Sequence, residues 1–176
     1  MFGDPLTNTK KLPTKKLIDI VKMQRGYDLP KTLRDETGGI PVYGANGVVG
    51  FHNEAKRNNP CVVTGRSGSL GEVRYVTNPC WPLNTTLFSI DTHENDVVYL
   101  KYLLTFFHLE RFTAGSGVPT LNRNLIHGEQ IIDVSLAEQK KFAVFVSQVD
   151  KLRFDVQQQI YKLETLKKSL MQEYFG

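Results

Sequence analysis

The last forty residues constrain the fold of this chain more than any other segment. From Ala137 to Tyr174 there is neither proline nor glycine, and apolar residues recur on a seven-residue period. The repeat has two rows offset by three positions, as the a and d positions of a coiled coil are. We name these residues the helix seam: Phe142, Phe145, Val149, Leu152, Val156, Gln159, Leu163, Leu166 and Leu170.

A helix over this stretch is longer than a small domain needs to cover its own core. At about 1.5 Å per residue its length is on the order of 55–60 Å. Ser135 and Glu138 have the S-x-x-E spacing of a capping box, which marks where the helix begins. The pattern therefore predicts one long helix over residues 135–176 that serves as a spacer or as a docking device.

The chain before this helix has the texture of a small β-rich domain. Between residues 38 and 90, short β-branched runs alternate with glycine turns, and Asn46-Gly47 is a strong hairpin signal. A further short strand is predicted over residues 131–134. The sequence thus predicts an α+β fold. A small β-rich domain with glycine-rich loops spans residues 1–134, and one long C-terminal coiled-coil helix spans residues 135–176.

One more helix is predicted inside the β-rich domain. Asn95-Asp96 supplies its cap, and the helix is expected to run from Val97 to Phe112. Its aromatic residues Tyr102, Phe106 and Phe107 are expected on the buried side.

The net charge of +4 is modest, but the charge is unevenly distributed. From residue 10 to residue 34 there are eight lysines and arginines against two aspartates, a net charge of +6. A basic stripe of this kind suits a phosphate backbone, although a solvated charged face has the same composition. The candidate DNA contacts in this stretch are Lys11, Lys15, Lys16, Arg25, Tyr27 and Lys31.

The turns of the β-rich domain, and a polar loop predicted over residues 116–124, are rich in hydrogen-bond donors. Arg66 stands between small residues, and Arg123 lies between two asparagines. Arginine can donate two hydrogen bonds to guanine and asparagine can pair with adenine, although asparagine and serine in turns often bond their own backbone instead. The candidate DNA contacts in these loops are Tyr43, Asn46, Arg66, Ser67, Ser69, Ser116, Thr120, Asn122, Arg123 and Asn124.

The sequence contains no set of residues with the spacing of a catalytic or metal site. Its four histidines are scattered, no serine has a G-x-S-x-G setting, and the glycine-rich loop over residues 64–71 lacks the Gly-Lys-Ser/Thr of a P-loop. Asn78-Pro79-Cys80-Trp81 is similar to the N-P-P-[YFW] loop of amino-methyltransferases, but it departs at the third position and no glycine-rich cofactor-binding turn precedes it. We therefore expect a turn with a buried Trp81, and no catalytic, metal or cofactor site.

The remaining features bear on the compartment. Cys61 and Cys80 match no metal or redox spacing, which favours reduced thiols. The sequence has no run of about 18 apolar residues and no apolar signal core at its N-terminus. We expect a cytoplasmic protein with no membrane partner.

The order of these segments resembles one half of the DNA-specificity (S) subunit of type I restriction–modification enzymes. The resemblance covers almost the whole chain. Each segment that carries it is degenerate alone, but together they occur in the family's order, followed by the long helix. The segments are residues 39–44, 62–68, 81–87, 115–123 and 136–140.

The resemblance implies a non-catalytic protein that acts within a larger complex. Residues up to about 134 would form a target recognition domain that reads one half of a split DNA site, and residues 135–174 a spacer helix that pairs with a second such helix. The expected partners are double-stranded DNA, modification subunits that methylate adenine with S-adenosylmethionine, and restriction subunits that translocate and cut DNA. ATP and Mg²⁺ would likewise belong to those subunits, with no cofactor in this chain.

Only one of the two units usual in the family is present. The start, Met1-Phe2-Gly3-Asp4-Pro5, is similar to the end, Tyr174-Phe175-Gly176, as at a junction between two units. The chain would be a natural half-subunit or half of a longer one. In either case the helix seam would be a large apolar patch, so we expect a homodimer through antiparallel helices. The main alternative is a protein-interaction adaptor with an oligomerising helix, and a weaker one is a stand-alone DNA methyltransferase.

Overall fold

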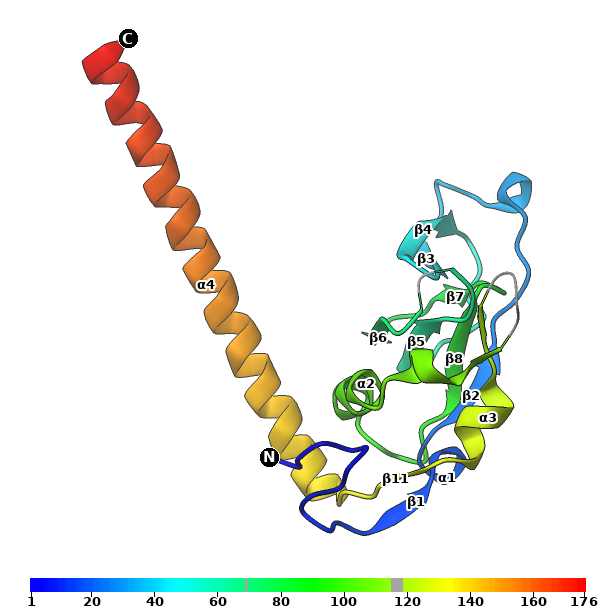
Figure 1. Ribbon diagram of the computed structural model, residues 1–176. Helices are drawn as coiled ribbons and strands as arrows, with labels where there is room; N and C mark the ends of the chain where they lie inside the picture. The colour runs from blue at the N-terminus through cyan, green and yellow to red at the C-terminus, as the bar shows by residue number, and fades with distance from the viewer. Residues whose placement is uncertain (69, 115–118) are drawn as a thin grey trace.

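The computed structural model describes residues 1–68, 70–114 and 119–176 (Figure 1). It has the predicted α+β fold, with a β-rich domain and a long helix that leaves it at one end. The strands are β1 (Thr14–Lys16), β2 (Lys22–Arg25), β3 (Ile40–Gly44), β4 (Gly47–His52), β5 (Cys61–Gly65), β6 (Val73–Val76), β7 (Trp81–Pro82), β8 (Thr86–Asp91), β9 (Thr113–Ala114), β10 (Thr120–Leu121) and β11 (Gln130–Ile132). The helices are α1 (Leu17–Ile20), α2 (Val97–Phe106), α3 (Arg123–Gly128) and α4 (Leu136–Phe175), with 3-10 turns η1 (Lys31–Leu33) and η2 (Leu109–Phe112).

Two sheets form the centre of the domain. One is antiparallel with the strand order β2-β8-β5-β6, and the other has the order β4-β3-β7, in which β3 and β7 are parallel. The predicted hairpin is the β3–β4 pair, where Gly44 lies opposite Gly47. Gly47 has a φ of +109°, a conformation that favours glycine, which explains the Asn-Gly signal. Two short pairs, β1–β11 and β9–β10, complete the domain.

The alternation of side chains along β5 divides the core into layers. Val62 belongs to the main core with Leu87 and the residues of α2, whereas its neighbour Val63 faces the other side of the sheet with Phe88. Because successive residues of a strand point to opposite faces, a strand buried on both sides has few polar residues, and β5, which is buried at every position, has only Thr64. Cys61 is also on this second face, and it and Cys80 are buried free thiols.

The helix predicted over residues 97–112 ends earlier than expected. α2 stops at Phe106, His108 takes a left-handed φ of +57°, and a separate turn, η2, follows. The buried stripe of α2 runs through Leu100, Leu103 and Leu104 to Phe107. The prediction that Phe106 is buried is wrong, because it lies about 100° around the helix from Phe107 and is 58% exposed. Tyr102, which was also predicted to lie on the buried side, is half-buried.

The polar loop predicted over residues 116–124 contains regular structure at its far end. Thr120–Leu121 form β10, and Arg123 begins α3. Asn122 explains the difference, because its side chain accepts a hydrogen bond from the Asn124 amide at 3.0 Å and caps the helix. Residues 115–118 lie outside the described residues.

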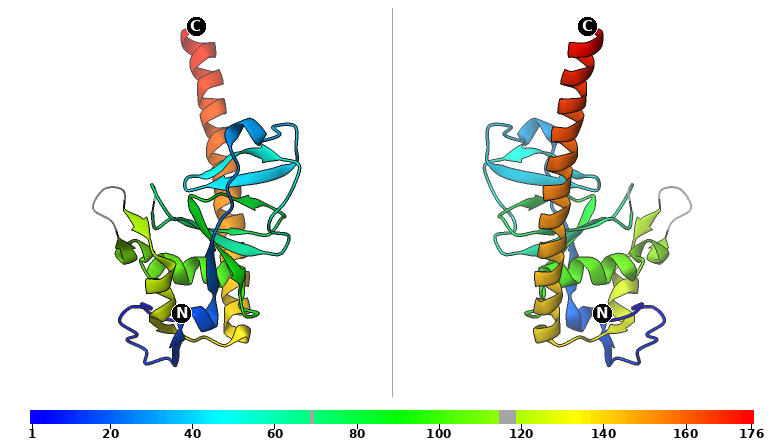
Figure 2. Two further views of the ribbon diagram at one scale, coloured as in Figure 1. Left: turned by 90° about the vertical axis from the view of Figure 1, so that its right-hand side faces the viewer. Right: turned by 90° about the vertical axis from the view of Figure 1, so that its left-hand side faces the viewer.

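The long predicted helix is present as α4, with 40 residues. The Ser135 side chain accepts from the Glu138 amide at 3.5 Å, but the Glu138 carboxylate pairs with Lys141 at 2.6 Å, so only half of the expected capping box forms. α4 packs against α2 near its start, and from residue 147 onward every residue is exposed (Figures 1 and 2). Among the described helices, none is long and apolar enough to cross a membrane.

Candidate nucleic-acid interface

The turn after β5 carries Arg66 and is held on both sides by backbone hydrogen bonds. The amides of Arg66 and Ser67 donate to the Thr85 carbonyl oxygen at 2.8 and 3.4 Å. On the other side, the Leu121 amide donates to the Arg66 carbonyl oxygen at 2.8 Å. The turn is thus fixed between the start of β8 and β10, which gives the Arg66 side chain a defined origin.

A hollow of about 370 Å³ lies beside this turn. Six of the predicted DNA contacts line it, although they come from β2, from the turn after β5 and from the β10–α3 segment. Folding therefore brings together donors that are far apart in sequence. We name this site the arginine hollow, and its residues are Arg25, Arg66, Leu87, Ala114, Thr120, Leu121, Asn122, Arg123 and Asn124.

The arginine hollow holds positive charge that its surroundings do not neutralise. In the described part of the chain, neither Arg66 nor Arg123 has a side-chain hydrogen bond or an ion pair. Arg25 is held from one side, since its guanidinium lies 3.4 Å from the Asp28 carboxylate and 3.4 Å from the Asn84 carbonyl oxygen. Two such guanidinium groups, those of Arg66 and Arg123, at a concave surface suit an anionic ligand with acceptor oxygens, such as phosphate or the edge of a base.

His127 attaches α3 to β2, and both elements contribute residues to this hollow. The Met23 amide donates to His127 Nε2 at 3.0 Å, which requires that this nitrogen carries no proton. Burial lowers the pKa of His127, and the positive charges of Arg123 and Lys22 lower it further. The neutral imidazole therefore holds the helix on which Arg123 is carried.

A second hollow of about 530 Å³ lies beside the β3–β4 hairpin. Three more predicted DNA contacts line it, namely Lys31, Asn46 and Ser67, and of these Lys31 and Asn46 are exposed. We name it the hairpin hollow. Its residues are Lys31, Arg34, Gly44, Ala45, Asn46, Val49, Ser67, Gly68, Leu83 and Thr85.

Two arginines from outside the hairpin donate hydrogen bonds to its backbone. The Arg34 guanidinium donates to the Val49 carbonyl oxygen at 3.1 Å, and the Arg74 guanidinium donates to the Ala45 carbonyl oxygen at 3.4 Å. These bonds fix both the strand and the turn that present Asn46. The amide side chain is therefore offered from a rigid support, as a base-reading residue requires.

The two hollows are adjacent. Arg66 lines the first and its neighbour Ser67 lines the second, and both are bonded to Thr85. The result is a polar, basic surface formed by loops on two sheets. A surface of this extent suits an extended polyanion better than a small metabolite.

The sequence matches a known protein family. A family model described as the type I restriction modification DNA specificity domain matches residues 10–165. The chain belongs to this family. Among curated proteins, none matches the chain.

Solved structures of type I specificity subunits share the fold of this specificity domain. The S subunit of the type I restriction–modification system from M. genitalium superposes with a TM-score of 0.69 at 16% identity, over 94% of this chain and 46% of that one. A chain from a study of complex assembly and conformational transition of the type I R-M system gives 0.68 at 12%, over 96% and 48%. The HsdS subunit from Thermoanaerobacter tengcongensis gives 0.63 at 12%, over 95% and 45%. The chain spans about half the length of these three.

The basic stripe predicted in the specificity domain is divided by folding. Lys11, Lys15 and Lys16 lie before or on β1, at the end of the domain opposite the β3–β4 hairpin (Figures 1 and 2). Lys15 is paired with Asp133 at 2.9 Å. Only the later members of the stripe, such as Lys31, reach the two hollows. These N-terminal lysines therefore lie apart from the two hollows.

The remaining predicted contacts line neither hollow or lie outside the described residues. Tyr27 is 36% exposed, with its ring 5.8 Å from that of Phe88. Tyr43 is half-buried against the second core layer, so it supports the hairpin. Ser69 and Ser116 are outside the described residues.

The helix seam behaves differently at its two ends. Its first member, Phe142, packs inside this chain, with its ring 5.3 Å from Tyr102 and 5.7 Å from Phe2. The remaining members are exposed along α4, from Phe145 at 55% to Leu170 at 44%. The apolar row is therefore uncovered over most of its length in the single chain.

The structure places the amino-methyltransferase-like segment in a supporting role. Trp81 is 6% exposed in β7, and the His52 ring packs edge-on against it at 5.1 Å. The expected burial of Trp81 is confirmed, although the residue lies in a strand rather than in a turn, and this ring cannot stack on a base. Among the described residues, no three metal-ligating side chains come together.

Several residues of the site carry no distinctive sequence signal. Arg34 is one member of the basic stripe among eight, and only the structure shows that it braces the hairpin. Thr85 offers only its backbone oxygen, which no sequence pattern reveals. His127 is one of four scattered histidines in the sequence, and its role depends on the Met23 amide, which is distant in sequence.

Proposed function

We propose that this chain is a non-catalytic DNA-recognition unit of a type I restriction–modification complex, and that it reads one half of a split DNA site. The arginine hollow carries the proposal. It gathers two asparagines, Asn122 and Asn124, with two arginines, Arg66 and Arg123, that have no ion pair among the described residues. Arg66 lies on a turn that backbone hydrogen bonds hold on both sides. A DNA duplex is the partner that supplies both phosphates and base edges to such a surface.

The two kinds of donor have separate tasks in this proposal. Arg66 and Arg123 donate to guanine edges in the major groove, and Asn46 and Asn124 are placed for adenine. Asn122 has part of its hydrogen-bonding capacity committed to capping α3, so it contributes mainly by position. Lys31 and the N-terminal lysines neutralise phosphates and hold the domain on the duplex without reading sequence.

The long helix supplies the second half of the proposal. Two copies of α4 pair antiparallel through the helix seam, so a homodimer presents two recognition domains to two half-sites. The exposed apolar row along α4 supports this pairing, since such a patch needs a partner in water. The modification and restriction subunits dock on this dimer and supply the chemistry, with S-adenosylmethionine, ATP and Mg²⁺ bound to them.

The exposed helix seam is also what a protein-interaction adaptor would present. Salt-dependent binding to heparin separates the two functions. A DNA-reading unit requires several hundred millimolar salt for elution, because it neutralises several phosphates at once. An adaptor elutes at low salt. A stand-alone methyltransferase would bind S-adenosylmethionine, and we expect none to bind the purified chain.

Selection from a library of randomised DNA duplexes tests the proposal. The purified chain, alone and with the modification subunit of its system, is incubated with the library and bound duplexes are sequenced. We expect fixed bases to emerge in one or two short blocks. If all sequences are retained equally in both samples, the chain does not read DNA sequence.

A further inference from the structure

One buried polar side chain joins the long helix to the recognition domain. Gln139 is 1% exposed. Its Nε2 donates to Asn95 Oδ1 at 2.6 Å and to the Val134 carbonyl oxygen at 2.7 Å, and its Oε1 accepts from the Asp96 amide at 2.9 Å. Both the donor and the acceptor end of the amide are thus used. Two of the bonds tie the helix to the loop of Asn95 and Asp96, and the third ties it to the segment just before the helix.

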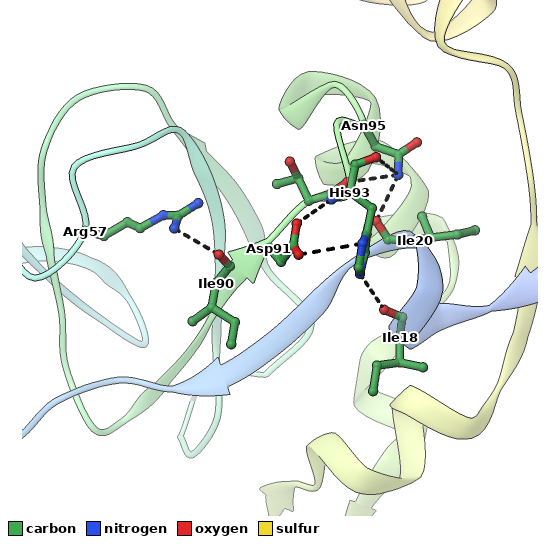
Figure 3. Close-up of polar contacts among 8 residues, drawn as sticks. Ile18, Ile20, Arg57, Ile90, Asp91, His93 and Asn95 are labelled. Atoms are coloured by element: carbon green, nitrogen blue, oxygen red, sulfur yellow. Dashed lines mark hydrogen bonds and ion pairs between the residues drawn. The ribbon is translucent and has the colours of Figure 1, made fainter.

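Asn95 carries this network deeper into the domain. Its Nδ2 donates to the carbonyl oxygens of Ile20 and Thr92, both at 2.9 Å. Next to it, His93 has a left-handed φ of +46°, and its Nε2 lies 3.0 Å from the Ile18 carbonyl oxygen. Figure 3 shows Asn95 and His93 reaching from one loop to the backbone of α1. The loop between β8 and α2 is therefore fastened to α1 at two points.

The segments that meet at Gln139 continue into the DNA-facing surface. α1 leads directly into β2, and β2 ends at Arg25 in the arginine hollow. Asp96 caps α2, since its carboxylate accepts from the amides of Val98 and Tyr99 at 2.8 and 3.0 Å. A movement of Gln139 would therefore also displace α1, β2 and α2, which position the recognition loops.

Apolar contacts complete the attachment on the same stripe of α4. Phe142 packs among the rings of Phe2, Tyr99 and Tyr102, and Val146 is 7% exposed. These contacts keep the helix on the domain, but dispersion and hydrophobic contacts are non-directional. Hydrogen bonds require alignment of donor and acceptor, so the Gln139 bonds set the angle.

The length of the unattached helix makes this angle important. Beyond Val146, α4 extends for about 44 Å at about 1.5 Å per residue. A tilt of about 10° at the root moves its far end by about 8 Å, which equals roughly two base pairs at about 3.4 Å per pair. A small change in the angle of α4 at its root therefore moves its far end by a distance that matters for the spacing of DNA sites.

We infer that Gln139 and Asn95 form a lock that fixes the direction in which α4 leaves the recognition domain. In a paired complex this lock makes Gln139 a positioning residue for the gap between half-sites. The statement about direction stands on the contacts alone, whereas the statement about the gap rests on the proposed function. The two are measured separately.

The direction is measured without DNA. One spin label on an exposed domain position, Glu54→Cys, and one on the helix, Lys168→Cys, report the distance between domain and helix in labelled chain diluted with unlabelled chain. Gln139→Met keeps the size of the side chain and removes its three hydrogen bonds. Asn95→Ala removes one of the two domain-side partners of Gln139, together with the bonds from Asn95 to α1 and to Thr92, and leaves the Asp96 amide in place. Gln157→Met makes the same change at an exposed position of the same helix.

The lock predicts a broader distance distribution for Gln139→Met and Asn95→Ala, and an unchanged one for Gln157→Met. Distributions as narrow as that of the parent chain in both lock variants, with the fold retained by circular dichroism, would overturn it. So would equal broadening in Gln157→Met. Asn95→Ala, which leaves α4 unchanged, decides the matter if Gln139→Met does not fold.

The gap is measured with duplexes in which the spacing between half-sites varies by single base pairs. The parent chain is expected to prefer one spacing, and Gln139→Met to bind spacings one or two pairs away with similar affinity while its affinity for a single half-site stays unchanged. Retained spacing preference in a variant with a broadened distance distribution would refute the link to the gap. Absence of any DNA binding by the parent chain would instead refute the proposed function and leave the lock standing.

Discussion

The Leu121 amide donates a hydrogen bond to the Arg66 carbonyl oxygen at 2.8 Å. This bond joins the turn after β5 to the segment in which Arg123 follows two residues later. The backbone positions from which Arg66 and Arg123 extend into the arginine hollow are therefore fixed relative to each other. Fixed relative positions are what the reading of adjacent bases requires.

Removing either arginine should relax sequence preference. Arg66→Ala or Arg123→Ala eliminates a pair of hydrogen bonds to a base, which is worth about 1–3 kcal/mol or about 5- to 150-fold in affinity for the preferred site. Binding to unrelated DNA should change little. Competition titrations with preferred and scrambled duplexes measure both quantities. Lys151→Ala, an equal loss of charge on α4, serves as the control, and an equal loss of affinity for both duplexes would contradict base reading.

Lysines should change the salt dependence of binding and leave preference intact. Lys31→Ala removes a charge at the hairpin hollow, and the slope of log affinity against log salt falls by about 0.9 for each phosphate that is no longer neutralised. Lys16→Ala, at the far end of the domain, should have a smaller effect, and Lys15→Ala a smaller one still because Asp133 already pairs with Lys15. A Lys15→Ala effect larger than that of Lys31→Ala would show that the duplex crosses the β1 end.

Acid should weaken the fold through His127. Its folded pKa lies below the ordinary value of 6.5, because burial and nearby positive charges disfavour the imidazolium. As the pH falls through about 6.5, His127 becomes protonated in the unfolded chain but stays neutral in the folded chain. The contribution of His127 to the free energy of unfolding is therefore complete above this pH, and it decreases as the pH falls toward the folded pKa. The urea midpoint of the parent chain should fall toward that of His127→Gln as the pH decreases across this range, because only the parent chain loses the stability that the neutral imidazole provides. Curves that stay parallel would rule out His127 as the cause.

A charge in the helix seam should separate the dimer without unfolding the recognition domain. Leu152 is 64% exposed in the single chain, so Leu152→Lys costs the domain no packing. In a paired helix it would place an ammonium group in an apolar layer. Sedimentation should show a monomer for Leu152→Lys and a dimer for Gln157→Lys, which adds the same charge outside the seam. A monomeric parent chain at micromolar concentration would refute self-pairing.

The elements that the sequence predicted well are those with a local cause. The seven-residue period gives α4, and the left-handed position at Gly47 gives the hairpin. Arginine beside small or polar turn residues is free to project, which is why the sequence singles out Arg66 and Arg123 as candidate donors. Their convergence in one hollow with Arg25 was not predictable, since it depends on which strands pair.

The elements that the sequence predicted poorly depend on distant contacts. The end of α2 is set by the left-handed conformation of His108, and α3 is too short for a periodic signal. The apolar period assigns Phe142 to a partner helix, but the ring packs within the chain. In the sequence, Gln139 looks like any polar residue of a helix, because its bond to Asn95, 44 residues earlier, has no local signal.

The most direct test of the central claim is a methylation map. The chain is co-expressed with the modification subunit of its system, and methylated adenines are located by single-molecule sequencing. The account predicts that the methylated sites share a motif of two short blocks of fixed bases separated by a gap. In Arg66→Ala, some bases of at least one block should no longer be fixed. No new methylation, with a modification subunit that is active beside a full-length specificity subunit, would contradict the claim that this chain recognises DNA for the complex.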